Sequence, residues 1–489
     1  MRATFFGFEA ARKALIVSQT GLDVTMQNVS NINTQGYTRQ RTDISSLSLG
    51  AGKDRYAKAV GDTVGQGAEV TGITQIRDQF LDARFRRDNA EYNYWNTKVN
   101  ILSDVEDVID EISTDALDAR LKDFYNQLQS FAGNAETVEF ASIFRSSAQK
   151  VVDMFRQYTF KLSEIKDEQV FNCETEISDV NKIVVKLAEY NKQIKGEYIQ
   201  GATPNELLDD RNLLLDKLSG MIGTNFDFYP DGQVSVSIGG RNILDSQKGN
   251  FIRPLSVDAS GYPVTVAFDD GKPISVNSGS VAAYLDVLNG KGVSADPGEN
   301  ESKGILYFQQ SIDELAKAFA DNFNTINDTL NDGRKLFTSG AAGGAITAGN
   351  IAISEEWQKD AMFITRSALT PTGGTPADGR PDNLLKMLES MNEKKQINPY
   401  FKGTFEEYAG SIMGDIGVEG NFAKDMAKTT GYVLSTIEDQ RESVSGVLLD
   451  EEVVNMVKFQ KAYNAAARLM TAMDEMLDVL INRLGIVGR

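Results

Sequence analysis

The stretch from Asp450 to Leu484 carries the most regular apolar pattern in the chain. Its apolar or small residues recur at alternating steps of three and four, and no Gly or Pro interrupts residues 447–484. This spacing is the a/d seam of a coiled-coil helix, which needs a partner helix to cover it. The seam consists of Met456, Phe459, Tyr463, Ala466, Met470, Met473, Leu477, Leu480 and Leu484.

The amino-terminal stretch has the same period and offers that partner. One seam row is large and the other mostly small, and a row of small side chains lets two helix backbones approach closely. We predict that the first helix pairs with the last; the alternative is two ordinary amphipathic helices, each docked on its own domain. The large row is Met1, Phe8, Leu15, Leu22 and Val29, and the second row is Thr4, Ala11, Ser18, Thr25 and Ile32.

An Asn-rich segment follows the first helix. Asn tolerates the left-handed conformation and bonds its own backbone, so Asn28, Asn31 and Asn33 suit a helix end that exposes carbonyl groups. Gly36, before Tyr37, supplies a position for positive φ. Taken alone, this segment is also compatible with a generic helix end that runs into a loop.

Two motifs at opposite ends of the chain carry a family resemblance. The first is Asn28-Val29-Ser30-Asn31 followed by Gly36-Tyr37-Thr38-Arg39-Gln40, and the second is Ser445-Gly446-Val447-Leu448-Leu449-Asp450-Glu451-Glu452 with Lys458-Phe459-Gln460-Lys461-Ala462-Tyr463. Together they resemble the axial proteins of the bacterial flagellum, and within that group the hook-associated proteins. The Leu-Leu-Asp-Asp-Arg-Asn segment at 207–212 is similar to a segment of the same family.

The resemblance implies a structural, self-assembling protein in an adaptor ring that joins hook to filament. The implied partners are further copies of the chain, the hook protein, the second hook–filament junction protein and a cytoplasmic chaperone that holds the C-terminal helix. The implied location is the extracellular flagellum, reached through the flagellar type III apparatus without a cleaved signal peptide. The alternatives are another axial role (second junction protein, flagellin or hook) or a non-flagellar helical rod.

We expect the subunit interface to combine the two seams with the motif between them. Terminal helices that line the central channel would bury these side chains against neighbouring copies. The expected interface residues are Phe8, Leu15, Leu22, Asn28, Val29, Asn31, Gly36, Tyr37, Met456, Phe459, Tyr463, Met470, Met473, Leu477, Leu480 and Leu484.

Composition argues against several other functions. The formal charge is −19, from 50 basic and 69 acidic residues, which disfavours nucleic acid and anionic membranes as partners. The chain has no His, and its single Cys, Cys173, excludes an intramolecular disulfide and a multi-Cys metal site. No catalytic, phosphate-binding or metal-binding spacing stands out, so we expect no enzyme activity and no cofactor.

The charged triplet Asp209-Asp210-Arg211 lies in a predicted helix, and we predict that its charges pair along that helix. No stretch approaches the length of a transmembrane helix, and no cleavable signal peptide is visible.

The middle of the chain predicts long helices interrupted by strands. Residues 134–195 lack Gly and Pro and carry an apolar stripe through Cys173. A helix of about 50 residues would be about 75 Å long, which is typical of a rod. Residues 225–300 alternate apolar and polar residues around the turns Pro230-Asp231-Gly232 and Asp269-Asp270-Gly271-Lys272, which predicts antiparallel strands.

We therefore predict a mainly α fold with inserted β. It is an elongated multi-domain rod with terminal coiled-coil helices, a helical bundle domain and an inserted antiparallel β domain. Nesting of the segments places both termini at one end and the inserts at the other. The expected parts are a terminal coiled-coil domain (1–36 and 447–489), a helical rod domain (37–224, 301–333 and 384–446), the β domain (225–300) and a Gly/Thr/Pro-rich insert (334–383), either β-rich or exposed and mobile.

Overall fold

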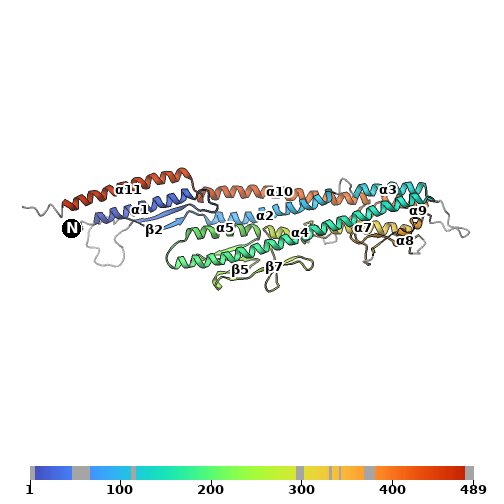
Figure 1. Ribbon diagram of the computed structural model, residues 1–489, viewed down its shortest axis with the longest axis horizontal. Helices are drawn as coiled ribbons and strands as arrows, with labels where there is room; N and C mark the ends of the chain where they lie inside the picture. The colour runs from blue at the N-terminus through green and yellow to red at the C-terminus, as the bar shows by residue number, and fades with distance from the viewer. Residues whose placement is uncertain are drawn as a thin grey trace, which may run out of the picture.

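The computed structural model describes an elongated, mainly helical rod (Figure 1). It covers residues 6–46, 67–111, 117–292, 302–329, 333–340, 343–367 and 380–479. The first and last helices lie together at one end of the rod, as the nested order predicts. None of the helices in these ranges is both long and apolar enough to span a membrane.

The two terminal helices pack side by side in one chain. The start of α1 (Phe6–Ser30) faces the end of α11 (Leu449–Asp478), because Gly7 lies against Met473 and Gly21 against Phe459. The pair is therefore antiparallel, and the predicted pairing of the first helix with the last is confirmed. A hairpin of β1 (Gln40–Ser46) and β2 (Ala68–Gln75) packs on α1.

The rod is built around one very long helix. Helix α4 spans 62 residues and runs alongside most of the other rod elements (Figure 1). This confirms the long helix predicted over residues 134–195, and its buried stripe is the predicted one, Cys173 included. Alongside it, α2 packs against α10 over much of their length. The rod helices are α2 (Gln79–Glu111), α3 (Leu117–Gly133), α4 (Val138–Ile199), α5 (Asn205–Met221), α7 (Ile305–Asn327), α9 (Asp382–Asn392) and α10 (Phe405–Ser445).

Two apolar clusters hold the rod together. The larger one is rich in aromatic side chains, with the rings of Phe319 and Phe323 centred 4.8 Å apart and Trp357 fully buried. The second joins the C-terminal half of α4 to α5 and to the strands, through residues such as Val180 and Val236. Neither cluster contains a described residue of α1 or α11.

The predicted β segment forms two small antiparallel sheets. Their strand orders are β3-β4-β5-β6 and β7-β8-β9, which leaves β3 at an edge. The strands are β3 (Asn225–Phe228), β4 (Val234–Ile238), β5 (Arg241–Asp245), β6 (Phe251–Ile252), β7 (Leu255–Asp258), β8 (Thr265–Phe268) and β9 (Pro273–Ile274), with a 3-10 turn, η3 (Ser246–Lys248), after β5.

Two expectations about this segment need correction. Its last described element is a helix, α6 (Ser280–Leu288), which packs on α2 and α4 with Val281, Ala283 and Val287 buried. The strands lie alongside the middle of the rod and not at the end opposite the termini (Figure 1). The reason is that they pack on the C-terminal half of α4.

The segment 334–383 is packed where it is described. Phe337, Ile351 and Trp357 are buried in the larger cluster. This part is therefore neither a separate β insert nor an exposed segment. Residues 341–342 and 368–379 lie outside the described ranges. Another hairpin follows α9, where the sequence predicts only helices. The elements are β10 (Phe337–Thr338), β11 (Ala352–Ile353), α8 (Glu355–Lys359), η5 (Ala361–Phe363), β12 (Lys395–Asn398) and β13 (Phe401–Gly403).

Candidate assembly interface

The contact between α1 and α11 uses the small row of α1. Ala11, Ser18 and Thr25 are buried, whereas the large row is only half-buried. The backbones approach so closely that a Cβ on Gly21 would lie 2.6 Å from the ring of Phe459. The hydroxyls of the small row bond to their own helix, Ser18 to the oxygen of Ala14 and Thr25 to that of Gly21. The half-buried large row is Phe8, Leu15, Leu22 and Val29.

The seam of α11 is covered only in part. Ala466 is its one buried seam residue in the described range, and Tyr463 is 38% exposed. The remaining described seam residues are half-buried: Met456, Phe459, Met470, Met473 and Leu477. Leu480 and Leu484 lie outside the described residues. A single chain therefore satisfies only part of each seam.

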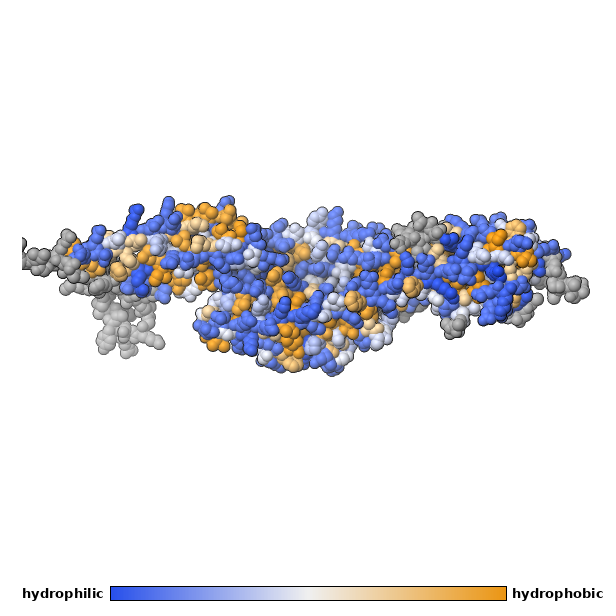
Figure 2. Space-filling model, in the orientation of Figure 1, coloured by the Kyte–Doolittle hydropathy of each residue, from blue (hydrophilic) through white to orange (hydrophobic). Residues whose placement is uncertain are grey.

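Other faces of the terminal pair are also apolar. Val454 is 66% exposed and Met476 is 54% exposed. Apolar residues gather on the surface of the pair, most densely near the start of α11 (Figure 2). Contiguous exposed apolar surface marks an interaction site in a water-soluble protein. The exposed residues are Leu448, Leu449, Val453, Val454, Val457, Leu469, Met476 and Val479.

Asn28 ties four parts of the chain together. Its amide nitrogen donates to the backbone oxygen of Gln40 at 2.9 Å and to the carboxylate of Glu452 at 3.2 Å. Its oxygen accepts from the Tyr37 hydroxyl at 2.8 Å and from the Gln40 N–H at 3.0 Å. All four bonds are buried or half-buried, and burial raises the pKa of Tyr37. This amide therefore joins α1, the Gly36-Tyr37 turn, β1 and α11.

The structure corrects the reason given above for the Asn-rich segment. None of Asn28, Asn31 and Asn33 has positive φ, whereas Gly36 does, at 83°. Asn31 does bond nearby backbone, donating to the oxygen of Gln27 at 3.0 Å. Asn28 belongs to the last turn of α1, and its side chain bonds to residues distant in sequence rather than to its own helix. Gly36 also leaves room for Leu213, whose Cβ lies 3.4 Å from the position of an added Cβ.

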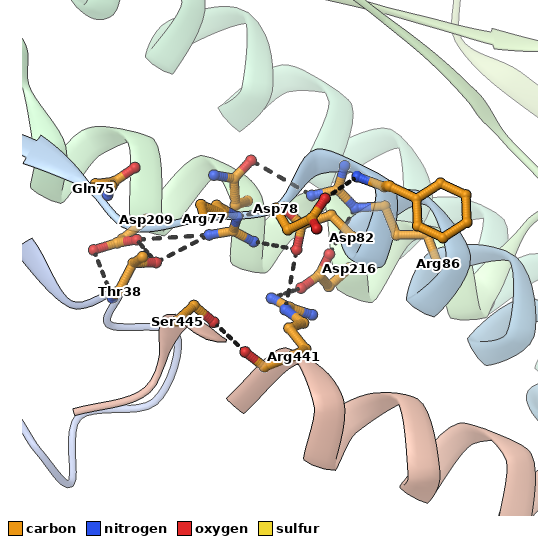
Figure 3. Close-up of polar contacts among 12 residues, drawn as sticks. Thr38, Gln75, Arg77, Asp78, Asp82, Arg86, Asp209, Asp216, Arg441 and Ser445 are labelled. Carbon is orange, nitrogen blue, oxygen red and sulfur yellow. Dashed lines mark hydrogen bonds and ion pairs between the residues drawn. The ribbon is translucent and has the colours of Figure 1, made fainter. Parts of the chain in front are cut away.

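A polar joint connects the terminal pair to the rod. Arg39 binds Glu452 at 2.8 Å and Glu451 at 2.6 Å, and its N–H donates to the backbone oxygen of Ser445. Arg441 of α10 bridges Asp82 at 3.1 Å and Asp216 at 2.6 Å (Figure 3). These ion pairs fix the end of α10 against α2 and α5.

Thr38 and Asp209 extend the same joint (Figure 3). The Thr38 N–H and hydroxyl donate to the Asp209 carboxylate at 3.1 and 2.5 Å. Arg77 contacts both Asp209, at 3.7 Å, and Asp82, at 2.5 Å. Burial raises the pKa of Asp209 to about 6, although the bonds from Thr38 and the charge of Arg77 oppose the shift.

The joint was not predicted from the sequence. The triplet at 209–211 was expected to pair charges along its helix, but Asp209 bonds to Thr38 and Arg211 bonds to the Gly232 oxygen at 2.6 Å. Both partners are distant in sequence, so helical spacing carries no signal for them. In the described part of the chain, no group of three His, Cys, Asp or Glu side chains is placed to hold a metal ion.

A rod whose paired terminal helices leave apolar faces uncovered has the architecture of a subunit of a self-assembling structure. Comparison with known proteins gives the family. The Flagellar hook-associated protein FlgK helical domain family matches residues 102–343, and the Flagellar basal body rod FlgEFG protein C-terminal family matches residues 439–484. The chain belongs to the flagellar hook-associated protein 1 family, because it is 31% identical over 521 residues to Flagellar hook-associated protein 1 of Bacillus subtilis, with 100% of both chains covered.

Other relatives agree with this assignment. The chain is 23% identical over 562 residues to Flagellar hook-associated protein 1 of Escherichia coli, which covers 96% of this chain and 98% of that protein. The solved structure of the flagellar hook junction protein FlgK from Burkholderia pseudomallei matches with a TM-score of 0.59 at 13% identity. It covers 74% of this chain and all of that chain, which supports the fold. The chain is thus a structural protein of the bacterial flagellum.

Proposed function

We propose that this chain forms the adaptor ring between hook and filament, with self-assembly as its activity and no catalytic role. The observation that carries the proposal is the half-covered pair of terminal seams in a chain of this family. Burial of one large aliphatic side chain is worth roughly 1.5–3 kcal/mol. The exposed and half-buried rows of α1 and α11 thus provide the driving force for contact with neighbouring copies.

The interface residues predicted from sequence remain part of this proposal. The large row of α1 and the outer faces of α11 contact neighbouring copies, while the small row of α1 holds the two helices of one chain together. Asn28, Gly36 and Tyr37 support the interface from inside the chain, because their contacts set the angle between the terminal pair and the rod.

The proposed partners beyond the ring follow from the family. The hook protein lies on one side of the ring and the second hook–filament junction protein on the other. Before export, a cytoplasmic chaperone holds the C-terminal helix, which the exposed apolar face of α11 supports. Export proceeds through the flagellar type III apparatus, and a chain with one buried free cysteine can unfold without reducing a disulfide.

The test is a charge placed on the seam. Leu477→Asp should abolish incorporation into flagella, because a buried carboxylate without a partner is costly at a subunit contact. Gln157→Asp adds the same charge at an exposed position of α4, outside the terminal pair, and should incorporate normally. Normal incorporation of the Leu477→Asp protein would rule out the seam as an interface.

Location is read in the same flagella by immunogold labelling. An antibody to residues 225–300 should give one narrow band where hook meets filament. Circular dichroism of both purified variants checks that the rod remains folded. Label along the whole hook or filament would assign the chain to another axial part.

A further inference from the structure

A large polar cleft lies outside the proposed assembly interface. It has a volume of about 1390 Å³ and runs between α2, α5 and the edge strand β3. Arginine and aromatic side chains line it: Arg86 lies 5.2 Å from the ring centre of Phe226, and Arg211 lies 5.3 Å from that of Phe228. The junction role leaves this cleft unexplained.

Arg211 is the unusual residue of this cleft. It is 6% exposed, and its hydrogen-bond acceptors are neutral: the Gly232 oxygen at 2.6 Å and the Asn212 side-chain oxygen at 3.5 Å. Its Nε has no partner in the described part of the chain. Burial, together with the charges of Arg86 and Arg77, lowers the pKa of Arg211 to about 10. A buried guanidinium beside two like charges is stabilised when an anion compensates it.

The other arginines that line the cleft already have carboxylate partners. Arg77 binds Asp82, Arg86 binds Asp216 and Arg87 binds Asp88. Arg211 has no such ion pair among the described residues, although its helix also carries Asp209, Asp210 and Asp216. Those carboxylates bond elsewhere, to Thr38, Tyr190 and Arg86. Among the described residues of the lining, Arg211 is therefore the arginine without a carboxylate partner.

Further polar atoms on the cleft wall also lack partners. They are the hydroxyls of Thr74 and Thr224 and the side-chain oxygen of Asn205, all buried and all on residues that line this cleft. Buried polar atoms are normally hydrogen-bonded in proteins, to the chain, to water or to a ligand. Around this cleft, the described part of the chain therefore has hydrogen-bonding groups that its own residues do not use.

We propose that this cleft is a binding site for an oxyanion, of the carboxylate or phosphate type, anchored by Arg211. The planar guanidinium suits the two oxygens of such a group. Two sources supply that chemistry: a free inorganic oxyanion, or a carboxylate side chain of a neighbouring copy of this acidic chain. The site does not depend on the junction role.

Sulfate titrated into the purified full chain is the first probe. At constant ionic strength, sulfate should bind with 1:1 saturation by calorimetry and raise the unfolding temperature more than chloride does. Arg211→Gln should bind sulfate about tenfold or more weakly, as expected for loss of a charge-assisted hydrogen bond. Arg156→Gln, at an exposed position of α4 outside the cleft lining, is the matched control and should bind as wild type does.

A second variant keeps the proposal testable if Arg211→Gln fails to fold. Glu91 and Asp227 are exposed residues of the cleft lining, and removing both charges should tighten sulfate binding. The double variant Glu91→Gln, Asp227→Asn should therefore gain affinity, whereas Glu355→Gln, Glu356→Gln on α8 changes the charge equally and should not. Sulfate binding no stronger than chloride binding, or equal in all variants, would overturn the site.

Sedimentation of the concentrated protein measures its self-association and so distinguishes the two sources of the oxyanion. If sulfate competes with self-association and Arg211→Gln weakens that association, the ligand is a carboxylate of a neighbouring copy. If sulfate binds without affecting self-association, the ligand is a free oxyanion. Both results support an oxyanion site and separate it from the terminal interface, which the Leu477→Asp variant tests independently.

Discussion

Asp209 shows how one residue of the joint depends on its surroundings. Its carboxylate accepts two hydrogen bonds from Thr38 and lies beside Arg77, yet burial outweighs these and raises its pKa to about 6 from an ordinary 3.8. Glu206 adds a like charge from the same helix. The folded chain therefore holds on to a proton here at a pH where the unfolded chain has released it.

This linkage predicts a pH dependence of stability. A carboxyl whose pKa is raised by folding binds more protons in the folded state, so its contribution to stability grows as pH falls from about 6 towards 3.8. Asp209→Asn removes that contribution and keeps an oxygen to accept from Thr38. As pH falls from about 6 to 3.8, the free energy of unfolding of the wild type, minus that of the variant, should increase by up to about 3 kcal/mol. Urea unfolding at several pH values measures it, and a difference that is constant with pH would contradict the assignment.

Residues of the joint also mark the limit of sequence-based prediction. The stripe through Cys173 and the positive φ of Gly36 follow from local spacing and local backbone, and both are found. The bond of Asn28 to Glu452 joins residues 424 positions apart, and that of Thr38 to Asp209 joins residues 171 positions apart. No local pattern contains that information, since it arises only when the two ends of the chain meet.

At the scale of elements, α10 is the long helix with the most unusual composition. It contains Gly410, Gly414 and Gly417, and an added Cβ at each would meet open space. Gly in a helix costs roughly 0.5–1 kcal/mol relative to Ala, because it loses more backbone freedom on folding. The chain thus carries a destabilised stretch in the helix that leads to the joint.

Gly→Ala at 410, 414 and 417 should therefore stabilise the free chain. The expected gain is about 0.5–1 kcal/mol per site, measured by thermal or urea unfolding. Gly431 is the control in the same helix, since its added Cβ would lie 3.2 Å from the Tyr92 ring and the gain should be smaller. Destabilisation by the three substitutions would mean that these positions are already in tight contact.

Elements also differ in how far the sequence predicts them. The pairing of α1 with α11 and the length of α4 follow from unbroken periodicity, which is a strong signal. The short helix α6 and the packed residues Phe337 and Trp357 are short apolar pieces near runs of turn residues, where the partner surface decides the conformation. Their structure depends on packing against α2, α4 and α7, which the local sequence does not contain.

At the scale of the whole molecule, stability is unevenly distributed. The two apolar clusters lie within the rod and its strands, whereas the terminal pair has few buried side chains in its described range. Segments with few buried apolar contacts open at low free-energy cost. The free chain should thus have a stable body and a loosely held end.

Hydrogen exchange tests this distribution. In the free chain, amides of α1 and α11 should exchange much faster than those of α4 around Val180, because the terminal pair opens without disrupting either cluster. Incorporation into flagella should slow exchange in α1 and α11 and leave α4 unchanged. Equal protection of α11 and α4 in the free chain would contradict the model of a seam completed by neighbours.

The polar joint also bears on how force passes through the molecule. The link between the terminal pair and the rod includes Arg39, Thr38 and Arg441 with their carboxylate partners. Torque applied at one end reaches the other partly through these bonds, and salt screens buried ion pairs much less than exposed ones. Because most of these contacts are buried, the joint acts as a coupling whose stiffness changes little with the ionic strength of the surroundings.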